Sequence, residues 1–457
     1  MKTKYCIRTR NLLVLALSAF ILFCTPSCKK YLDAKPDKSL VVPSTLNDLQ
    51  AILDNSSTMN EGPSYGIASS DNYFLADDDY STLTDDVKNA YTWSNYSYNY
   101  PNDWATIYNV IYPANIALEG IEKITPTAET QLSWNNIKGS ALLFRALSLL
   151  QGTFIFCNTY DPSTANTDMG MVLRLTSDFN APSQRSTLQE TYDRIIMDLK
   201  EAAPLLPNTP IHVIRPSKAA AYGILARAYL SMRKYDSCKK YANLCLQIKS
   251  DLFDFNTISN SGFIFPQFNK EVIMATLITQ PVYYCISQSF TNIDSNLYHS
   301  YSDSDLRKAA YFESTPTGYH FVGSYSGSPY QMFTGLATDE VYLMRAECNA
   351  RMGNVDSALT DLNKLMSTKW SDSLFIPFSA NSSEEALQLI LHERRKELVF
   401  RGLRWMDVKR LNKEGAGITL LRNVDGKLYT LPPNDKRYAL PLPMDIVNST
   451  GVKQNPQ

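Results

Sequence analysis

The side chains best suited to chemistry in this 457-residue chain are aromatic rings that lie beside amides and carboxylates, in segments without helical periodicity. Trp93 and Tyr96 flank Asn95, and Asp71 lies upstream. An aromatic face can cover the apolar C–H face of a sugar ring, while amides and carboxylates bond its hydroxyls. One covered face contributes only about 1 kcal/mol at roughly 25 cal/mol per Å². We therefore expect several such residues to act together in a ligand site.

A later segment is equally rich in tyrosines, and Tyr298 and Tyr319 are its candidates for ligand contact. For every one of these rings, packing of the loop onto neighbouring helices remains the alternative. Trp104, Tyr108 and Tyr112 follow one another at four-residue spacing, which places them on one face of a helix, and we expect them in the core.

Residues for catalysis or metal binding form no recognisable pattern. The four histidines are scattered, and none has the spacing of a metal site. No phosphate-binding glycine loop or nucleophile elbow is present, and the aspartates within residues 71–86 lack the spacing of a calcium loop. We expect no catalytic residue, metal or cofactor. Because a pair of hydrolytic carboxylates can come from distant positions, a glycoside hydrolase remains an alternative.

Cys28 is the residue whose position predicts a covalent modification. Basic residues precede an apolar run from Leu12 to Cys24, and Cys28 directly follows a small residue, Ser27. Residues 1–27 are therefore predicted to be a signal peptide, too short to span a membrane. The junction resembles the lipobox of bacterial lipoproteins, in which the cysteine thiol takes a diacylglycerol. An ordinary secretory signal is the alternative, and no later apolar stretch is predicted to span a membrane.

Net charge and cysteine content argue against two classes of protein, nucleic-acid binders and disulfide-stabilised domains. The formal net charge is −1, so a nucleic-acid partner is not expected. Cys157, Cys238, Cys245, Cys285 and Cys348 remain after the signal and Cys28, an odd number that does not indicate a disulfide framework.

The elements that must position these residues are predicted to be helices. Residues 222–245 and 342–365 share the small-residue spacing of a tetratricopeptide repeat, 120 positions apart. Residues 104–124 and 134–156 read as another helix pair. Residues 383–411 read as one terminal helical stretch with Ser383 as its N-cap. The fold class is therefore all-α, a tetratricopeptide-repeat-like scaffold with long loop-rich insertions and minor β structure.

Three segments rich in Ser, Asn, Asp and Gly interrupt this scaffold, near residues 60–101, 158–185 and 254–335. We expect loops with short strands there, and ligand chemistry in them rather than in the helices. Residues 28–457 are predicted to form a single domain.

The C-terminal third carries motifs that resemble the SusD/RagB family of outer-membrane nutrient-binding lipoproteins. The family's late E-R-x-x-E-L-x-F-x-G-x-R-x-x-D-x-x-R pattern matches residues 393–410, with Arg401 where an acidic residue is usual. Its closing signature matches residues 431–456. Further matches lie at residues 217–230, at 340–363, and at Tyr31, Leu32 and Asp33. The resemblance spans the mature chain.

The resemblance implies a non-enzymatic, glycan-binding lipoprotein of the outer membrane, facing the exterior and anchored through acylated Cys28. It further implies a SusC-like TonB-dependent transporter as partner, over which the lipoprotein lies as a lid. RagB-like peptide uptake is the alternative within the family. The stretch from Glu393 to Leu398, together with Arg401, is expected to form ion pairs that orient its helix rather than to touch ligand.

Overall fold

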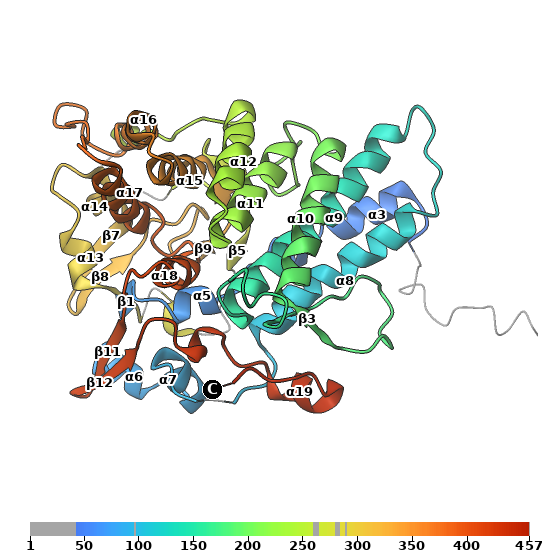
Figure 1. Ribbon diagram of the computed structural model, residues 1–457, viewed down its shortest axis with the longest axis horizontal. Helices are drawn as coiled ribbons and strands as arrows, with labels where there is room; N and C mark the ends of the chain where they lie inside the picture. The colour runs from blue at the N-terminus through green and yellow to red at the C-terminus, as the bar shows by residue number, and fades with distance from the viewer. Residues whose placement is uncertain (1–42, 96, 259–264, 279–283, 288–289, 457) are drawn as a thin grey trace, which may run out of the picture. The chain divides into compact units, whose positions relative to one another are not determined.

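The structure, a computed structural model, describes residues 43–95, 97–258, 265–278, 284–287 and 290–456. Within this part, the residues from Thr45 onward form one compact unit. It contains 17 α-helices and only two-stranded sheets (Figure 1), which confirms the all-α class with minor β structure. The predicted signal peptide 1–27, Cys28 and Tyr96 lie outside the described residues.

The α-helices are α3 Leu46–Leu53, α4 Ser56–Met59, α5 Tyr65–Ala68, α6 Asp77–Ser81, α7 Asp85–Tyr91, α8 Asp103–Ile121, α9 Gln131–Phe156, α10 Leu188–Leu205, α11 Lys218–Ser231, α12 Tyr235–Ile248, α13 Ser295–His299, α14 Leu306–Tyr311, α15 Thr338–Arg351, α16 Val355–Met366, α17 Ser383–Glu397, α18 Arg404–Asn412 and α19 Met444–Thr450.

The paired strands are β1 Tyr73–Phe74 with β6 Asn292–Ile293, β2 Met169–Val172 with β3 Arg185–Thr187, β4 Val272–Met274 with β10 Leu336–Ala337, β5 Leu277–Ile278 with β9 Met332–Phe333, β7 Phe312–Thr315 with β8 Gly318–Phe321, and β11 Leu420–Val424 with β12 Lys427–Leu431. All six pairs are antiparallel.

The long helices pack in chain order from α8 through α9, α10 and α11 to α12 (Figure 1). Helix α9 lies at the centre of the first three. It is long and apolar enough to cross a membrane, contrary to the expectation that no later stretch would be. However, 94% of its apolar window is buried inside the protein. Its neighbours supply the apolar contacts, so α9 is a core helix here.

The two repeat-like segments form the predicted helix pairs. They are α11 with α12 and α15 with α16, and α12 packs directly on α15 (Figure 1). Ala226, Ala242 and Ala346 are fully buried at these contacts, because small side chains let the helix backbones approach. The repeats are thus neighbours in space although the third insertion separates them in sequence. The five cysteines between Cys157 and Cys348 are free and buried, in agreement with the sequence.

The predicted terminal stretch 383–411 is two helices rather than one. Helix α17 is capped by Ser382, not by Ser383, because the Ser382 hydroxyl accepts a hydrogen bond from the Glu385 amide. The chain then breaks at Phe400 and Gly402, whose φ angles are 56° and 76°. Helix α18 follows in a new direction. Left-handed backbone cannot continue a right-handed helix, which the residue pattern alone did not predict.

The first insertion is more helical than expected, since it contains α5, α6 and α7. Of the aspartates within residues 71–86, Asp77, Asp78 and Asp79 lie in the first turn of α6, and Asp85 and Asp86 lie in the first turn of α7. Carboxylates at a helix N-terminus stabilise it through the helix dipole. These five aspartates therefore stabilise the helices in which they lie.

Candidate functional site

The exposed part of the third insertion holds two tyrosines that the sequence analysis selected. The rings of Tyr298 and Tyr319 are stacked, with centroids 3.7 Å apart and planes 14° from parallel. Both side chains are partly buried. Within the described residues, Tyr319 makes no other ring contact. The structure thus brings together two residues that are 21 positions apart, in a stacked pair that stays partly exposed.

Two short elements position this pair. Tyr298 lies on α13, whose N-cap Asp294 accepts a hydrogen bond from the Leu297 amide. Tyr319 lies on β8 of the β7–β8 hairpin. Strand β8 begins directly after the turn at Gly318, where φ is 155° and an added Cβ would lie 2.7 Å from Asn292 Oδ1. A side chain at position 318 would therefore displace the hairpin from β6, on which Asn292 lies.

Neighbouring side chains hold the Tyr298 ring from the protein side. The Phe312 ring meets it edge-on at 5.7 Å, and the Lys308 ammonium lies 5.4 Å from its centroid. Lys308 also pairs with the exposed Asp303 at 2.7 Å. Burial, together with the hydrogen bond and charge of Tyr319, raises the pKa of Tyr298 to about 12. The Tyr298 phenol is therefore neutral at physiological pH, and a phenol can both donate and accept hydrogen bonds with hydroxyl groups. We call Tyr298, Tyr319 and Lys308 the tyrosine platform.

Asp71 is not free to bind a ligand. Its carboxylate accepts two hydrogen bonds from Arg404, at 2.7 and 2.9 Å, and one from Arg395 at 3.2 Å. Burial alone would raise the pKa of Asp71. The positive charges of Arg404 and Arg395 have the larger effect and hold that pKa well below its usual range. Arg395 also lies 3.9 Å from Asp294, the N-cap of α13. Asp71 is therefore a structural anchor that connects the first insertion, through Arg395, to the helix carrying Tyr298.

Trp93 was predicted to contact ligand, and the structure gives it a different role. Only 3% of its surface is exposed, and its indole N–H donates to the Ser69 carbonyl at 3.0 Å. The Arg422 guanidinium lies over its ring at 5.2 Å, and also over the rings of Tyr73 and Tyr91. Because the Trp93 ring is buried and Arg422 lies over it, no face of this ring can contact a sugar. Trp93 belongs to a buried aromatic cluster around Arg422.

Asn95 differs from Trp93, although it is only two residues away. It is exposed and makes no hydrogen bond within the described residues. Its neighbour Tyr96 is outside those residues, so the roles proposed for the two stay predictions.

The described residues contain one group of acids close enough to hold a metal ion. Oxygens of Glu271, Asp339 and Glu397, all buried, lie within 4.8 Å of one another. However, the Lys369 ammonium lies 2.7 Å from Glu271 and 3.6 Å from Glu397. Arg401 pairs with Asp339 at 3.0 Å. Because Lys369 and Arg401 already occupy the space beside these acids, the arrangement does not fit a divalent metal site.

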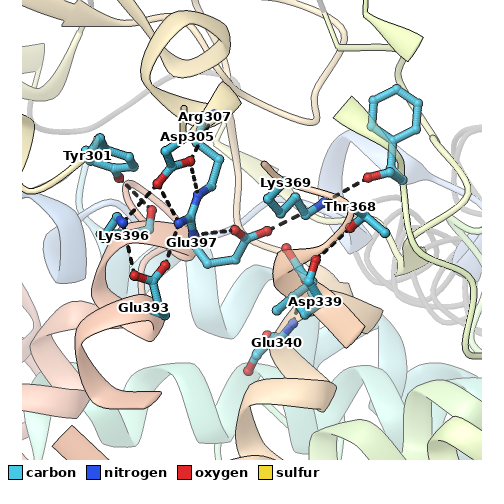
Figure 2. A network of polar contacts seen from close by, with 12 residues as sticks. Tyr301, Asp305, Arg307, Asp339, Glu340, Thr368, Lys369, Glu393, Lys396 and Glu397 are labelled. Carbon is cyan, nitrogen blue, oxygen red and sulfur yellow. Dashed lines mark hydrogen bonds and ion pairs between the residues drawn. The ribbon is translucent and has the colours of Figure 1, made fainter. Parts of the chain in front are cut away.

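These acids continue into a larger ion-pair network at the end of α17 (Figure 2). Arg307 contacts Asp305, Glu393 and Glu397, and Lys396 contacts Asp305 and Glu393. The Glu393–Leu398 segment thus forms ion pairs, as predicted. The expected pair between Glu397 and Arg401 is absent within the described structure, because Arg401 lies beyond the helix break and pairs with Asp339 instead.

Two family models match this chain, one over the part that contains the Asp71 anchor and one over the part that contains α17 and α18. Residues 30–230 match the family described as "Starch-binding associating with outer membrane", and residues 338–457 match the family described as "SusD family". The chain belongs to the SusD/RagB family. The segment between the two matches, residues 231–337, contains the tyrosine platform. Members of the SusD/RagB family are non-catalytic binding proteins.

One curated SusD-like protein is similar to this chain over part of its length. SusD-like protein P2 of Formosa agariphila is 25% identical over 334 residues, which is 58% of this chain and 64% of that relative. The match therefore spans less than two thirds of the relative's length.

Solved structures of SusD proteins share the fold. A SusD superfamily protein from Bacteroides thetaiotaomicron has a TM-score of 0.75 at 21% identity, covering 90% of this chain and all of that one. A SusD-like carbohydrate binding protein from Bacteroides vulgatus has a TM-score of 0.68 at 19% identity, covering 89% of this chain and 97% of that one. At these identities the comparison establishes a common fold.

Two residues important to the candidate site escaped the sequence analysis. Lys308 completes the tyrosine platform, and Arg422 organises the buried cluster that contains Trp93. Neither stands in a motif. Arg422 lies 329 positions from Trp93, so only the fold brings them together.

Proposed function

We propose that this SusD-family protein binds glycans at the tyrosine platform, without cleaving them. The observation that carries the proposal is the stacked pair of Tyr298 and Tyr319, which is half-buried on an insertion. A rigid pair of rings offers a preorganised apolar surface, and the two phenol hydroxyls can bond sugar hydroxyls. Positive charge at Lys308 and the exposed carboxylate of Asp303 add polar partners at the edge.

The physiological role that we propose is capture and delivery. The chain would be tethered to the outer membrane through acylated Cys28, with its binding surface to the exterior, and would pass glycans to a SusC-like TonB-dependent transporter. The family description, which names starch binding and outer-membrane association, supports this proposal. Modest affinity suits delivery, because tethering beside a pore supplies a high effective concentration.

Binding at the platform is tested with a panel of maltoheptaose, cellohexaose, xylohexaose and mannohexaose, measured by calorimetry. Tyr319→Ala is expected to weaken binding of the best probe about fivefold to tenfold, since one ring face contributes on the order of 1 kcal/mol. Tyr330→Ala is the matched control, because Tyr330 is a 74% exposed tyrosine of the same insertion. If the Tyr319→Ala and Tyr330→Ala variants bind the best oligosaccharide with equal affinity, the tyrosine platform is not the binding site.

The same experiment separates the alternatives. Product analysis after long incubation should find every probe intact, and turnover of any of them would overturn the non-catalytic assignment. A parallel panel of short peptides tests RagB-like uptake. If peptides bind in a way that depends on Tyr319 and no glycan binds, the ligand of the platform is a peptide and not a glycan.

Tether and partner need separate tests. Cys28→Ala is expected to release the protein from the membrane fraction, and a variant that stays membrane-bound would refute the lipid anchor. A pull-down from outer membranes is expected to recover a TonB-dependent barrel. Failure to recover it under conditions that preserve other transporter–lipoprotein pairs would refute the partnership but leave glycan binding intact.

A further inference from the structure

A second cavity lies well away from the tyrosine platform, between α8, the segment that follows β2, and α19. It encloses about 370 Å³. Its walls include Trp104, Tyr108 and Tyr112 of α8, Phe179 of the second insertion, and Ile446 of α19. This volume lies in the range of small-ligand sites, which are concave and mostly apolar with a few polar groups.

The cavity has aromatic rings on two sides. Trp104 and Tyr108 meet at 4.9 Å with planes 36° apart, and Tyr112 and Phe179 meet at 4.6 Å with planes 35° apart. The expectation that the three aromatics of α8 lie in the core holds for Trp104, which is 5% exposed. It is wrong for Tyr112, which is 37% exposed. Phe179 is 76% exposed.

The loop that carries Phe179 is braced against such movement. The Arg174 guanidinium donates to the Ala181 carbonyl at 2.5 Å and to the Ser183 hydroxyl at 2.6 Å. From α8, the Asn115 amide donates to the Arg174 carbonyl at 3.0 Å. Glu119 accepts hydrogen bonds from both the amide and the hydroxyl of Ser177. An exposed phenylalanine is thus held in a fixed position, and a rigid apolar group over a cavity is preorganised for a ligand.

The polar groups of the cavity identify the class of that ligand. The Asn109 amide, the Tyr112 hydroxyl and the Thr176 hydroxyl line it and make no hydrogen bond within the described structure. Of the charged lining residues, Arg174 is engaged in its own loop, and Asp178 accepts from Asn180 at 2.8 Å. Aromatic walls with free neutral donors and acceptors match an uncharged ring that has an apolar face and several hydroxyls.

We propose that this cavity, the α8–α19 cleft, is a second glycan-binding site that takes one or two pyranose units. The sugar ring lies against Phe179 and Tyr112, and its hydroxyls bond Asn109 and Thr176. The inference rests on the proposed glycan-binding function but not on the platform, since the two sites share no residue. Two sites on one lipoprotein would engage two parts of a long glycan, so affinity rises with chain length.

The test measures binding at the cleft in a variant whose platform has lost Tyr319. In a Tyr319→Ala background, calorimetry with the four oligosaccharides named above should still detect one weaker binding event. Adding Phe179→Ala should weaken that event about fivefold to tenfold. Adding Asn109→Ala should also weaken it, through a lost hydrogen bond. Leu132→Ala is the matched control, because Leu132 is 81% exposed at the opposite end of the α8–α9 pair. Phe179 and Leu132 are both exposed, so thermal unfolding should not change in either variant.

Each result decides between the two sites. Residual binding that depends on Phe179 supports the cleft. Loss of all binding in Tyr319→Ala, or residual binding insensitive to Phe179→Ala, overturns the cleft and leaves the platform. No binding of any probe to the wild type refutes both proposals. If Phe179→Ala leaves glycan binding unchanged but reduces recovery of the transporter barrel, the cleft is a protein contact and the inference is wrong.

Discussion

At the scale of single residues, burial decides which of the candidate side chains can meet a ligand. Trp93 and Tyr319 look alike in sequence, since each is an aromatic residue in a polar insertion. The Trp93 ring lies under Arg422 with its N–H bonded to a carbonyl, whereas Tyr319 is only partly buried. The same substitution should therefore act on stability at one position and on binding at the other.

Trp93→Ala is expected to lower the free energy of unfolding by about 3–5 kcal/mol, the usual cost of removing a buried large aromatic side chain. Tyr319→Ala should lower it by less than about 1 kcal/mol, because its ring is partly exposed. Urea denaturation of both variants measures the difference. A Trp93→Ala variant as stable as the wild type would show that the ring is not part of the core.

Glu397 should make stability depend on pH. Burial raises its pKa to about 7 from the ordinary value of 4.5, and this outweighs the neighbouring Lys369 and Arg307, while nearby Asp339 and Glu271 raise the pKa further. Between those values the folded state holds a proton that the unfolded state releases. Stability conferred by this group is therefore present at the low end of the window and falls as pH rises towards 7.

Urea denaturation of the wild type and of Glu397→Gln from pH 4.5 to above 7 tests this, because the amide does not titrate. The wild type should lose stability relative to the variant as pH rises. Asp103, whose pKa burial also raises to about 7, titrates in both proteins and cancels from the difference. Parallel stability curves would show that Glu397 does not titrate in this window.

At the scale of elements, the α17–α18 boundary shows how a local backbone conformation changes the fold. Helical periodicity runs through residues 383–411 without interruption, yet the chain turns at Phe400 and Gly402. The turn lets Arg401 leave the helical register and reach Asp339 on α15. It also directs α18 towards α5 and α9, which α18 contacts.

Gly402→Ala should lower the free energy of unfolding by about 1–2 kcal/mol, because a residue with a Cβ is strained at a φ of 76°. The site has room for the methyl group, since the nearest atom would be Thr334 Cγ2 at 3.6 Å. Gly353→Ala is the matched control. Gly353 has a φ of 80° and open space around it, so it reports the backbone cost alone. Similar losses in the two variants, measured by urea denaturation, would confirm that the strain is in the backbone.

At the scale of the whole described unit, buried charges hold the insertions against the helical scaffold. Arg307 on α14 of the third insertion meets Glu393 and Glu397 on α17. Arg404 on α18 meets Asp71 of the first insertion. These pairs lie between segments far apart in sequence, and each fixes an insertion that carries aromatic side chains. The buried ion pairs that hold these insertions against the helices thus also position the platform.

Arg307→Met should be strongly destabilising, by about 3–5 kcal/mol, because it leaves buried carboxylates without their partner. The next residue provides a matched control. Lys308 pairs with Asp303, which is 97% exposed, so Lys308→Met should change stability by less than about 1 kcal/mol. Thermal and urea denaturation of the two variants gives the comparison. Equal stability of the two would mean that the network can reorganise around the missing guanidinium.

The helical scaffold could be predicted from the sequence because its signals are local. The small residues around Ala226 and Ala346 recur at fixed spacing, and helix pairs form between neighbouring segments. The site was only partly predictable. Tyr298 and Tyr319 were selected by composition, but the same reasoning selected Trp93 and Asp71, which the fold buries or pairs. Composition of a loop does not specify which side chains face inward.

The sequence by itself determined the fold class, the family and the segments in which aromatic side chains gather, because periodicity and motifs are properties of neighbouring residues. Tertiary structure alone decided which aromatic side chains are buried and which are exposed. Packing of segments tens to hundreds of residues apart stacks Tyr298 on Tyr319, covers Trp93 with Arg422, and brings Phe179 against Tyr112 beside a cavity. Exposure of a side chain depends on everything that packs around it, and that is set only when the whole chain has folded.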